Sequence, residues 1–143
     1  MADQVECQGV WKIYGKRATE SLTIIEQRGL TKDDAHQELD CVIGVRDASF
    51  TVNQGEIFCI MGLSGSGKST LVRHINRLIE PTAGEVRVNG ELISSLNERA
   101  MRRLRAETIG MVFQHMALWP HRTIRDNVAF GLEIGRASCR ERV

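Results

Sequence analysis

Residues 62–69 read GLSGSGKS, and this stretch decides how the rest of the chain is interpreted. It satisfies G-x-x-x-x-G-K-[S/T], a phosphate-binding loop in which glycines let successive backbone N–H groups turn inward around a polyphosphate. The apolar run 57–61 comes directly before it, and apolar residues at helical spacing follow from Ser69 towards Pro81. The pattern predicts a buried parallel strand, a glycine loop and a helix, which is the setting that the motif requires.

The residues of this loop have separable chemical tasks. Lys68 supplies a mobile positive charge for the β- and γ-phosphates, and the Ser69 hydroxyl is suited to bind Mg²⁺. The N-terminus of the following helix adds free N–H groups and a positive dipole end. The sequence therefore predicts that the chain binds ATP or GTP; a glycine-rich turn that binds nothing is the alternative. The residues expected to hold the nucleotide are Gly62, Ser64, Gly65, Ser66, Gly67, Lys68, Ser69 and Thr70.

The residues before the loop predict antiparallel strands and a pair of helices. Apolar residues at 5–14 and an alternating pattern at 45–52 indicate strands. The pattern between 16 and 39 is helical, and Thr31 with Asp34 resembles a capping box. We interpret this segment as a two-helix insertion.

The residues after the loop predict a hairpin, two helices and a second buried strand. Asn89-Gly90 is a dipeptide that favours a tight hairpin turn. Ser95 with Glu98 resembles another capping box, and Thr123 with Asp126 a third. The apolar run 109–113 indicates the buried strand. Arginines between 99 and 105 indicate a solvated helix face, with a phosphate- or lipid-binding surface as the alternative.

Composition narrows the classes of protein that fit. The chain has 143 residues, enough for about one domain, and a net charge of +1, which gives no bulk electrostatic case for nucleic acid. Four cysteines without zinc-site spacing predict small buried side chains in a reducing compartment. The longest clean apolar run, 57–61, is too short to cross a bilayer. We expect a cytosolic chain that reaches a membrane only through a partner.

Three segments together resemble the ATP-binding cassette (ABC) ATPases. Residues 62–71 resemble the Walker A segment of that family, 81–86 its continuation into a hairpin, and 111–114, MVFQ, its Q-loop. Residues 117–132 are similar to the importer branch. The resemblance implies an α/β P-loop NTPase fold, with an N-terminal antiparallel part, a helical insertion at about 16–41 and a helical subdomain from about 115. The cassette is incomplete over these 143 residues.

The resemblance also assigns roles to two residues outside the loop. By position Gln114 matches the Q-loop glutamine, which senses the γ-phosphate through Mg²⁺ or water where the membrane subunit docks. Lys68 and Gln114 are thus the expected catalytic residues, and Ser69 and Gln114 the expected metal-binding residues. Tyr14, in KIYG, resembles the A-loop aromatic that stacks on adenine. The alternatives are a polar residue ending a strand and a half-buried strand aromatic.

About thirty residues separate Tyr14 from the next strand, which is more than most ABC proteins have. In this respect the chain resembles the ATPase subunits of glycine betaine, proline betaine and related quaternary-amine importers. That resemblance implies permease subunits, a solute-binding protein and a second ATPase subunit as partners, at the cytoplasmic face of the inner membrane. An importer ATPase for another small solute is the alternative, and a different phosphate-loop enzyme such as a small kinase is a third possibility.

Several elements of a complete cassette do not occur in these residues. There is no LSGGQ signature loop and no apolar strand ending in Asp-Glu after Gln114, and His115 and His121 come too early to be the switch histidine. We therefore predict a chain that binds ATP without turning it over. Residues 135–143, GRASCRERV, do not resemble the family. We expect 1–134 to be the front portion of the cassette and 135–143 a foreign or frame-shifted tail; a natural basic tail that binds an acidic partner is the alternative.

Overall fold

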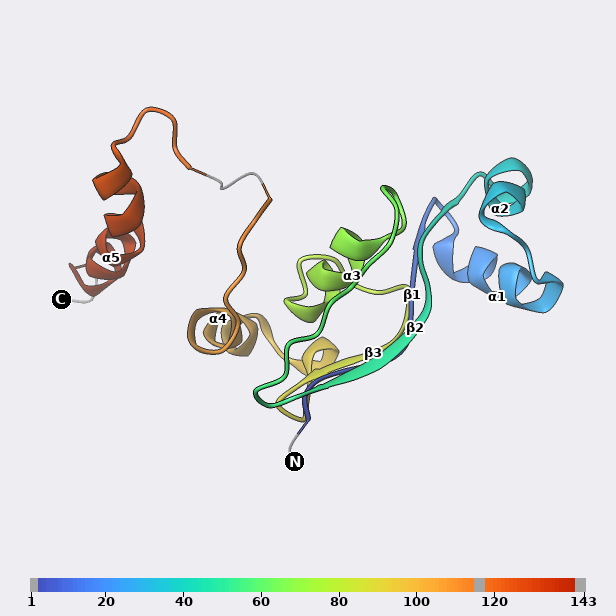
Figure 1. Ribbon diagram of the computed structural model, residues 1–143, viewed down its shortest axis with the longest axis horizontal. Helices are drawn as coiled ribbons and strands as arrows, with labels where there is room; N and C mark the ends of the chain where they lie inside the picture. The colour runs from blue at the N-terminus through green and yellow to red at the C-terminus, as the bar shows by residue number, and fades with distance from the viewer. Residues whose placement is uncertain (1–2, 115–117, 141–143) are drawn as a thin grey trace. The chain divides into compact units, whose positions relative to one another are not determined.

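The structure, a computed structural model, describes residues 3–114 and 118–140 of the chain (Figure 1). The chain divides into two compact units, Met1–Ile109 and Gly110–Val143. In chain order the elements are β1 (Asp3–Tyr14), α1 (Ala18–Arg28), α2 (Lys32–Leu39), β2 (Val42–Asn53), α3 (Lys68–Ile75), β3 (Ala83–Val88), β4 (Glu91–Leu92), the short 3-10 helix η1 (Ile93–Ser95), α4 (Glu98–Glu107) and α5 (Ile124–Arg140). The first unit contains the sheet with α1 to α4, and the second contains α5.

The sheet of the first unit has the strand order β2-β1-β3-β4, and every pair is antiparallel. The strands expected at 5–14 and 45–52 are therefore β1 and β2. Gly9, at φ +53°, lies within a bulge of β1 between Cys7 and Val10. Neighbouring residues of a strand point to opposite faces, so Val10 and Trp11 belong to two different apolar clusters.

The first cluster joins the β1–β2 ribbon to α1 and α2, which lie beyond the end of the ribbon where β1 ends (Figure 1). Arg46 fixes this packing, because its Nη1 donates to the Leu30 carbonyl at 2.8 Å and its guanidinium lies 5.6 Å from the Trp11 ring centroid. The expected capping box is confirmed: the Thr31 hydroxyl accepts from the Asp34 N–H. Buried members of the cluster are Trp11, Ile13, Leu22, Ile25, Leu30, Ala35, Cys41 and Ile43.

The second cluster fixes α3, the helix that follows the phosphate loop. Leu71 and Ile75 of α3 pack against buried residues of the sheet, η1 and α4. Arg105 then holds the end of the helix, since its Nε donates to the Asn76 carbonyl at 2.8 Å and its Nη2 to the Arg77 carbonyl at 2.9 Å. The buried members are Cys7, Val10, Val45, Val86, Val88, Ile93 and Met101.

The two predicted buried strands, of which 57–61 was expected to be parallel, do not form in this structure. Neither 57–61 nor 109–113 is a strand, and Ile57, Met61 and Val112 are 92%, 88% and 94% exposed. A parallel strand needs neighbouring strands to satisfy its N–H and C=O groups, and the sheet of the described residues includes neither run. Phe58 instead stacks on Phe50 of β2, with ring centroids 4.9 Å apart.

Two of the predicted local turns and caps are confirmed, and two predictions need correction. Asn89 and Gly90, at φ +50° and +80°, form the predicted hairpin turn, and the Thr123 hydroxyl accepts from the Asp126 N–H at the start of α5. The cap of α4 is Asn97 rather than Ser95, because the Asn97 side chain accepts from the Ala100 N–H at 2.9 Å. The helix after the loop also ends earlier than its apolar spacing suggested, at Ile75.

Cysteines and possible membrane spans complete the comparison. Cys7 and Cys41 are buried as expected, but Cys59 is exposed because 57–61 is not covered. Cys139 falls among residues whose side chains lie outside the description. None of the helices in the described residues is both long and apolar enough to cross a membrane.

Candidate nucleotide-binding site

The phosphate loop opens directly into α3 without a side-chain cap. Gly67 is the N-cap residue at φ +95°, a left-handed conformation that favours glycine, and Gly65 is at φ +77°. The first turn of a helix leaves N–H groups without partners inside the helix, and here no side-chain cap among the described residues takes them. The loop therefore presents backbone donors and a positive dipole end, which suit an anion.

Lys68, the first residue of α3, folds back over its own loop. Its Nζ donates to the carbonyls of Gly62 and Leu63, each at 2.7 Å, and lies 3.4 Å from the Ser66 hydroxyl. The ammonium group thus sits among the loop residues where the sequence predicted phosphate binding. Because these bonds are to exposed groups of the loop, a phosphate can replace them without burying an unpaired charge.

The hydroxyl groups expected at the site differ in exposure. Ser64, Ser66 and Ser69 are exposed, whereas Thr70, within the first turn of α3, is half-buried. Ser69 is therefore accessible for a metal ion that arrives with a nucleotide. In the described ranges there is no group of three or more His, Cys, Asp or Glu side chains that could hold a metal by itself.

A glycine in β2 connects the loop with Tyr14. A β-carbon on Gly67 would collide with the carbonyl oxygen of Gly44, so loop and strand backbones are in close contact there. The α-carbon of Gly44 lies next to the Tyr14 ring, because a β-carbon added there would be 2.7 Å from Tyr14 Cε2. Tyr14 ends β1 opposite Val42 and is 41% exposed, so its ring is available to a ligand.

Lys12, two residues before Tyr14 in β1, contacts the same tyrosine. Its Nζ lies 5.3 Å from the Tyr14 ring centroid and donates to the Glu80 carbonyl at 2.8 Å. A cation over an aromatic ring is attracted by the ring's electrons, so this contact restrains the orientation of the tyrosine. The structure thus brings Tyr14 and the loop to one strand, through Gly44.

Gln114 belongs to the second unit, Gly110–Val143. It occupies an exposed turn directly after residues 109–113. The Lys68 loop and Tyr14 lie in the first unit. Whether Gln114 approaches the metal and the γ-phosphate therefore stays a prediction.

The comparison with known families adds the decisive observation: the family model described as ABC transporter matches residues 45–143. The chain belongs to the ABC transporter family. The matched range includes the phosphate loop, Gln114 and the residues 135–143. The expected foreign or frame-shifted origin of residues 135–143, and the boundary at 134, stay predictions.

Two bacterial relatives in the ABC family are ATP-binding proteins of transport systems. The chain is 46% identical over 142 residues to the "Glycine betaine/proline betaine transport system ATP-binding protein ProV" of Escherichia coli, covering 99% of this chain and 35% of the relative. It is 49% identical over 131 residues to the "Glycine betaine/carnitine transport ATP-binding protein GbuA" of Listeria monocytogenes, covering 92% and 33%. The chain spans about a third of the length of these relatives.

A solved ABC structure has the same fold. The dimeric structure of a post-hydrolysis state of the ATP-binding cassette MJ0796, bound to ADP and Pi, superposes with a TM-score of 0.67 and 28% sequence identity. The match covers 91% of this chain and 47% of that chain. The fold is thus that of an ABC ATPase domain, an α/β architecture, represented here by its antiparallel sheet and its helices.

Sequence reasoning missed two residues beside this ABC loop. Gly44 is one; a glycine inside a strand often marks a close backbone approach, and this signal was available. His74 of α3 is the other: it is fully buried. Its Nδ1 bonds the Ile79 carbonyl at 2.7 Å, and its buried Nε2 has no hydrogen-bond partner in the described structure. Burial lowers the pKa of His74, opposed by the Ile79 bond and assisted by the charge of Lys12.

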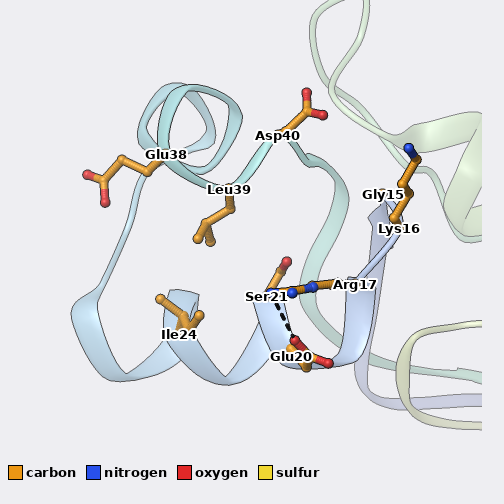
Figure 2. A pocket seen from close by; sticks show the side chains of 9 residues that line it. All are labelled: Gly15, Lys16, Arg17, Glu20, Ser21, Ile24, Glu38, Leu39 and Asp40. Atoms are coloured by element: carbon orange, nitrogen blue, oxygen red, sulfur yellow. Dashed lines mark ion pairs between the residues drawn. The ribbon is translucent and has the colours of Figure 1, made fainter.

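A cavity lies between α1 and α2, which follow Tyr14 in the chain (Figure 2). It measures about 470 Å³, and Ile24 and Leu39 point towards each other across it. At its rim Arg17 pairs with Glu20 at 3.6 Å. The rim carries both signs of charge, from Lys16, Arg17, Glu20, Glu38 and Asp40. It therefore has no bias towards an anion, unlike the phosphate loop.

Proposed function

We propose that this chain carries the Mg·ATP-binding part of the ATPase subunit of an importer for glycine betaine, proline betaine or a related quaternary amine. The observation that carries the proposal is the loop 62–69 opening into α3, with the Lys68 ammonium held among its backbone carbonyls. The names of the two bacterial relatives support the solute class. An importer for another small solute is the alternative, since an ATPase subunit does not itself select the solute.

Each residue of the site has a proposed task. The glycines 62, 65 and 67 let backbone N–H groups surround the phosphates, and Lys68 neutralises them. The Ser69 hydroxyl would hold Mg²⁺ when the ion arrives with the nucleotide. When bound, the ion supplies charge neutralisation to the β- and γ-phosphates. Tyr14 stacks on the adenine, and Gln114 approaches the γ-phosphate through Mg²⁺ or water.

The proposed assembly follows from the family. Two ATPase subunits, permease subunits and a solute-binding protein form the importer, and the ATPase lies at the cytoplasmic face of the inner membrane. The net charge of +1 provides no bulk attraction for nucleic acid. For catalysis, the 143 residues contain neither a signature loop nor a catalytic glutamate. We therefore propose that this chain binds ATP but does not hydrolyse it unaided.

Calorimetric titration of the purified chain with Mg·ATP tests the binding proposal. We expect saturable binding that inorganic tripolyphosphate also produces, with lower affinity because it has no base to stack. Binding of neither ligand would refute the proposal. The solute class requires the whole gene: cells that lack it should lose uptake of labelled glycine betaine, and a Lys68→Ala gene should fail to restore it. Normal uptake in the deletion strain would refute the proposed solute class. It would not affect the proposal that the chain binds Mg·ATP.

A further inference from the structure

Gly44 is the residue at which the two halves of the candidate site meet. On one side, its missing side chain leaves room for the Tyr14 ring, whose Cε2 and Cδ2 would lie 2.7 and 3.3 Å from an added β-carbon. On the other side, its carbonyl oxygen lies against the α-carbon of Gly67, the last residue before α3. A single peptide unit of β2 therefore contacts both the aromatic ring and the phosphate loop.

The two contacts have different tolerance for change. The nearest neighbour of Gly44 is the ring of a side chain, which can rotate away. The neighbour of Gly67 is backbone in a strand, and Gly67 itself is at φ +95°, where a side chain is strained. A methyl group at Gly44 should therefore move the ring, whereas one at Gly67 should distort the loop.

We infer that Gly44 is a positioning residue that sets the separation between the adenine-stacking ring of Tyr14 and the phosphate loop. The inference rests on the proposed function, because it takes Tyr14 as the base platform. A ring held at a fixed distance from the loop favours ligands whose base and triphosphate are joined by one ribose, since both ends then bind without further ordering. Gly44 thus determines selectivity for a nucleoside triphosphate over a bare polyphosphate.

The test compares ATP with inorganic tripolyphosphate in wild type and three variants. Gly44→Ala should weaken ATP binding by at least about fivefold, the lower end of what a stacked base contributes. Its affinity for tripolyphosphate should stay within about twofold of wild type, because the loop is not displaced. Gly67→Ala should weaken both ligands. Gly131→Ala, at a glycine of α5 with open space around it, is the matched control and should change neither.

A double-mutant cycle shows whether Gly44 acts through the ring. In a Tyr14→Ala background, Gly44→Ala should change ATP affinity by less than about twofold, because no ring remains to be displaced. If Gly44→Ala alone destabilises the fold in a thermal melt, Tyr14→Ala should restore the midpoint, which supports the same contact. Equal losses for ATP and tripolyphosphate in Gly44→Ala, or an undiminished ATP loss in the Tyr14→Ala background, would overturn the inference. Wild-type protein that binds neither ligand would instead refute the proposed function.

Discussion

Lys68 Nζ donates to the carbonyl oxygen of Gly62, at 2.7 Å. The one charged side chain of the phosphate loop therefore bonds to the first residue of the same loop. The ammonium makes an equally short bond to Leu63. These bonds position the charge at the centre of the loop before any ligand arrives. Replacement of Lys68 therefore affects both the charge that meets a phosphate and the shape of the loop that receives it.

Lys68→Ala should weaken binding of a fluorescent ATP analogue by about tenfold to a hundredfold, the effect of losing a hydrogen bond to a charged group. Lys68→Arg is the matched control, because it retains the charge but not the compact ammonium geometry. We expect its affinity to lie between those of wild type and Lys68→Ala. Equal affinity of wild type and Lys68→Ala in this titration would contradict the assignment of the loop.

Ser69→Ala should reduce the benefit that Mg²⁺ gives to ATP binding, because the exposed hydroxyl is the proposed protein ligand of the ion. With EDTA present, the variant and wild type should bind ATP equally well. Ser94→Ala, at an exposed serine of η1, is the control and should retain the full Mg²⁺ effect. An unchanged Mg²⁺ effect in Ser69→Ala would remove this residue from the metal site.

Tyr14→Ala should lose ATP affinity by about 1–3 kcal/mol, the contribution of one stacked base. Tyr14→Phe should lose much less, since the ring remains. Tripolyphosphate should bind all three proteins alike in competition experiments, because the phosphate contacts lie in the loop. If both variants bind ATP as wild type does, the aromatic is a strand residue without a role in base binding.

The purified 143-residue chain should show no steady-state phosphate release from ATP. Positioning and charge stabilisation supply most of phosphoryl-transfer catalysis, and Lys68, Ser69 and Gln114 provide only part of both. Lys68→Ala serves as the control for contaminating ATPases, which it would leave unchanged. Release at the rate of an intact transporter ATPase that disappears in Lys68→Ala would show that the chain is catalytically sufficient.

The free energy of unfolding should fall on acidification more steeply in wild type than in His74→Asn. The folded state keeps the pKa of His74 below its ordinary value, so below about pH 6.5 the unfolded chain takes up a proton that the folded chain resists. The stabilisation is fully present above that pH and is lost as pH falls. Asparagine retains a donor for the Ile79 carbonyl without titrating.

Urea titrations followed by circular dichroism at pH 7.5 and 5.5 measure this difference. Subtracting the His74→Asn values isolates the buried histidine from the other titrating groups. The wild type should lose more stability between the two pH values than the variant does. Parallel pH dependences in the two proteins would show that His74 is protonated as easily when folded as when unfolded.

Local signals in the sequence predicted local structure well. Thr31 with Asp34, Asn89 with Gly90 and the phosphate loop all depend on residues a few positions apart, and the structure contains each of them. The start of α4 has two candidate capping residues, and Asn97 rather than Ser95 accepts the helix N–H. The two candidates are two residues apart, a difference that hydrophobic spacing does not resolve.

Long-range features were harder to predict for a physical reason. Residues 57–61 have a strand-like composition, but a strand exists only where another strand pairs with it. The burial of His74 and the contact of Gly44 with Gly67 likewise depend on which segments the fold brings together. The loop could be found from its motif, whereas the link between the loop and Tyr14 required coordinates.

The run 57–61, which lies outside the sheet, also determines the tendency of the protein to self-associate. It is uncharged, rich in β-forming residues and largely exposed, with Ile57 at 92% and Met61 at 88%. Such an open backbone is a template for strand addition by a second molecule, which is the first step of aggregation. The colloidal stability of a concentrated solution is therefore limited by the segment that leads into the phosphate loop, and any strand laid along that segment would act as a solubiliser.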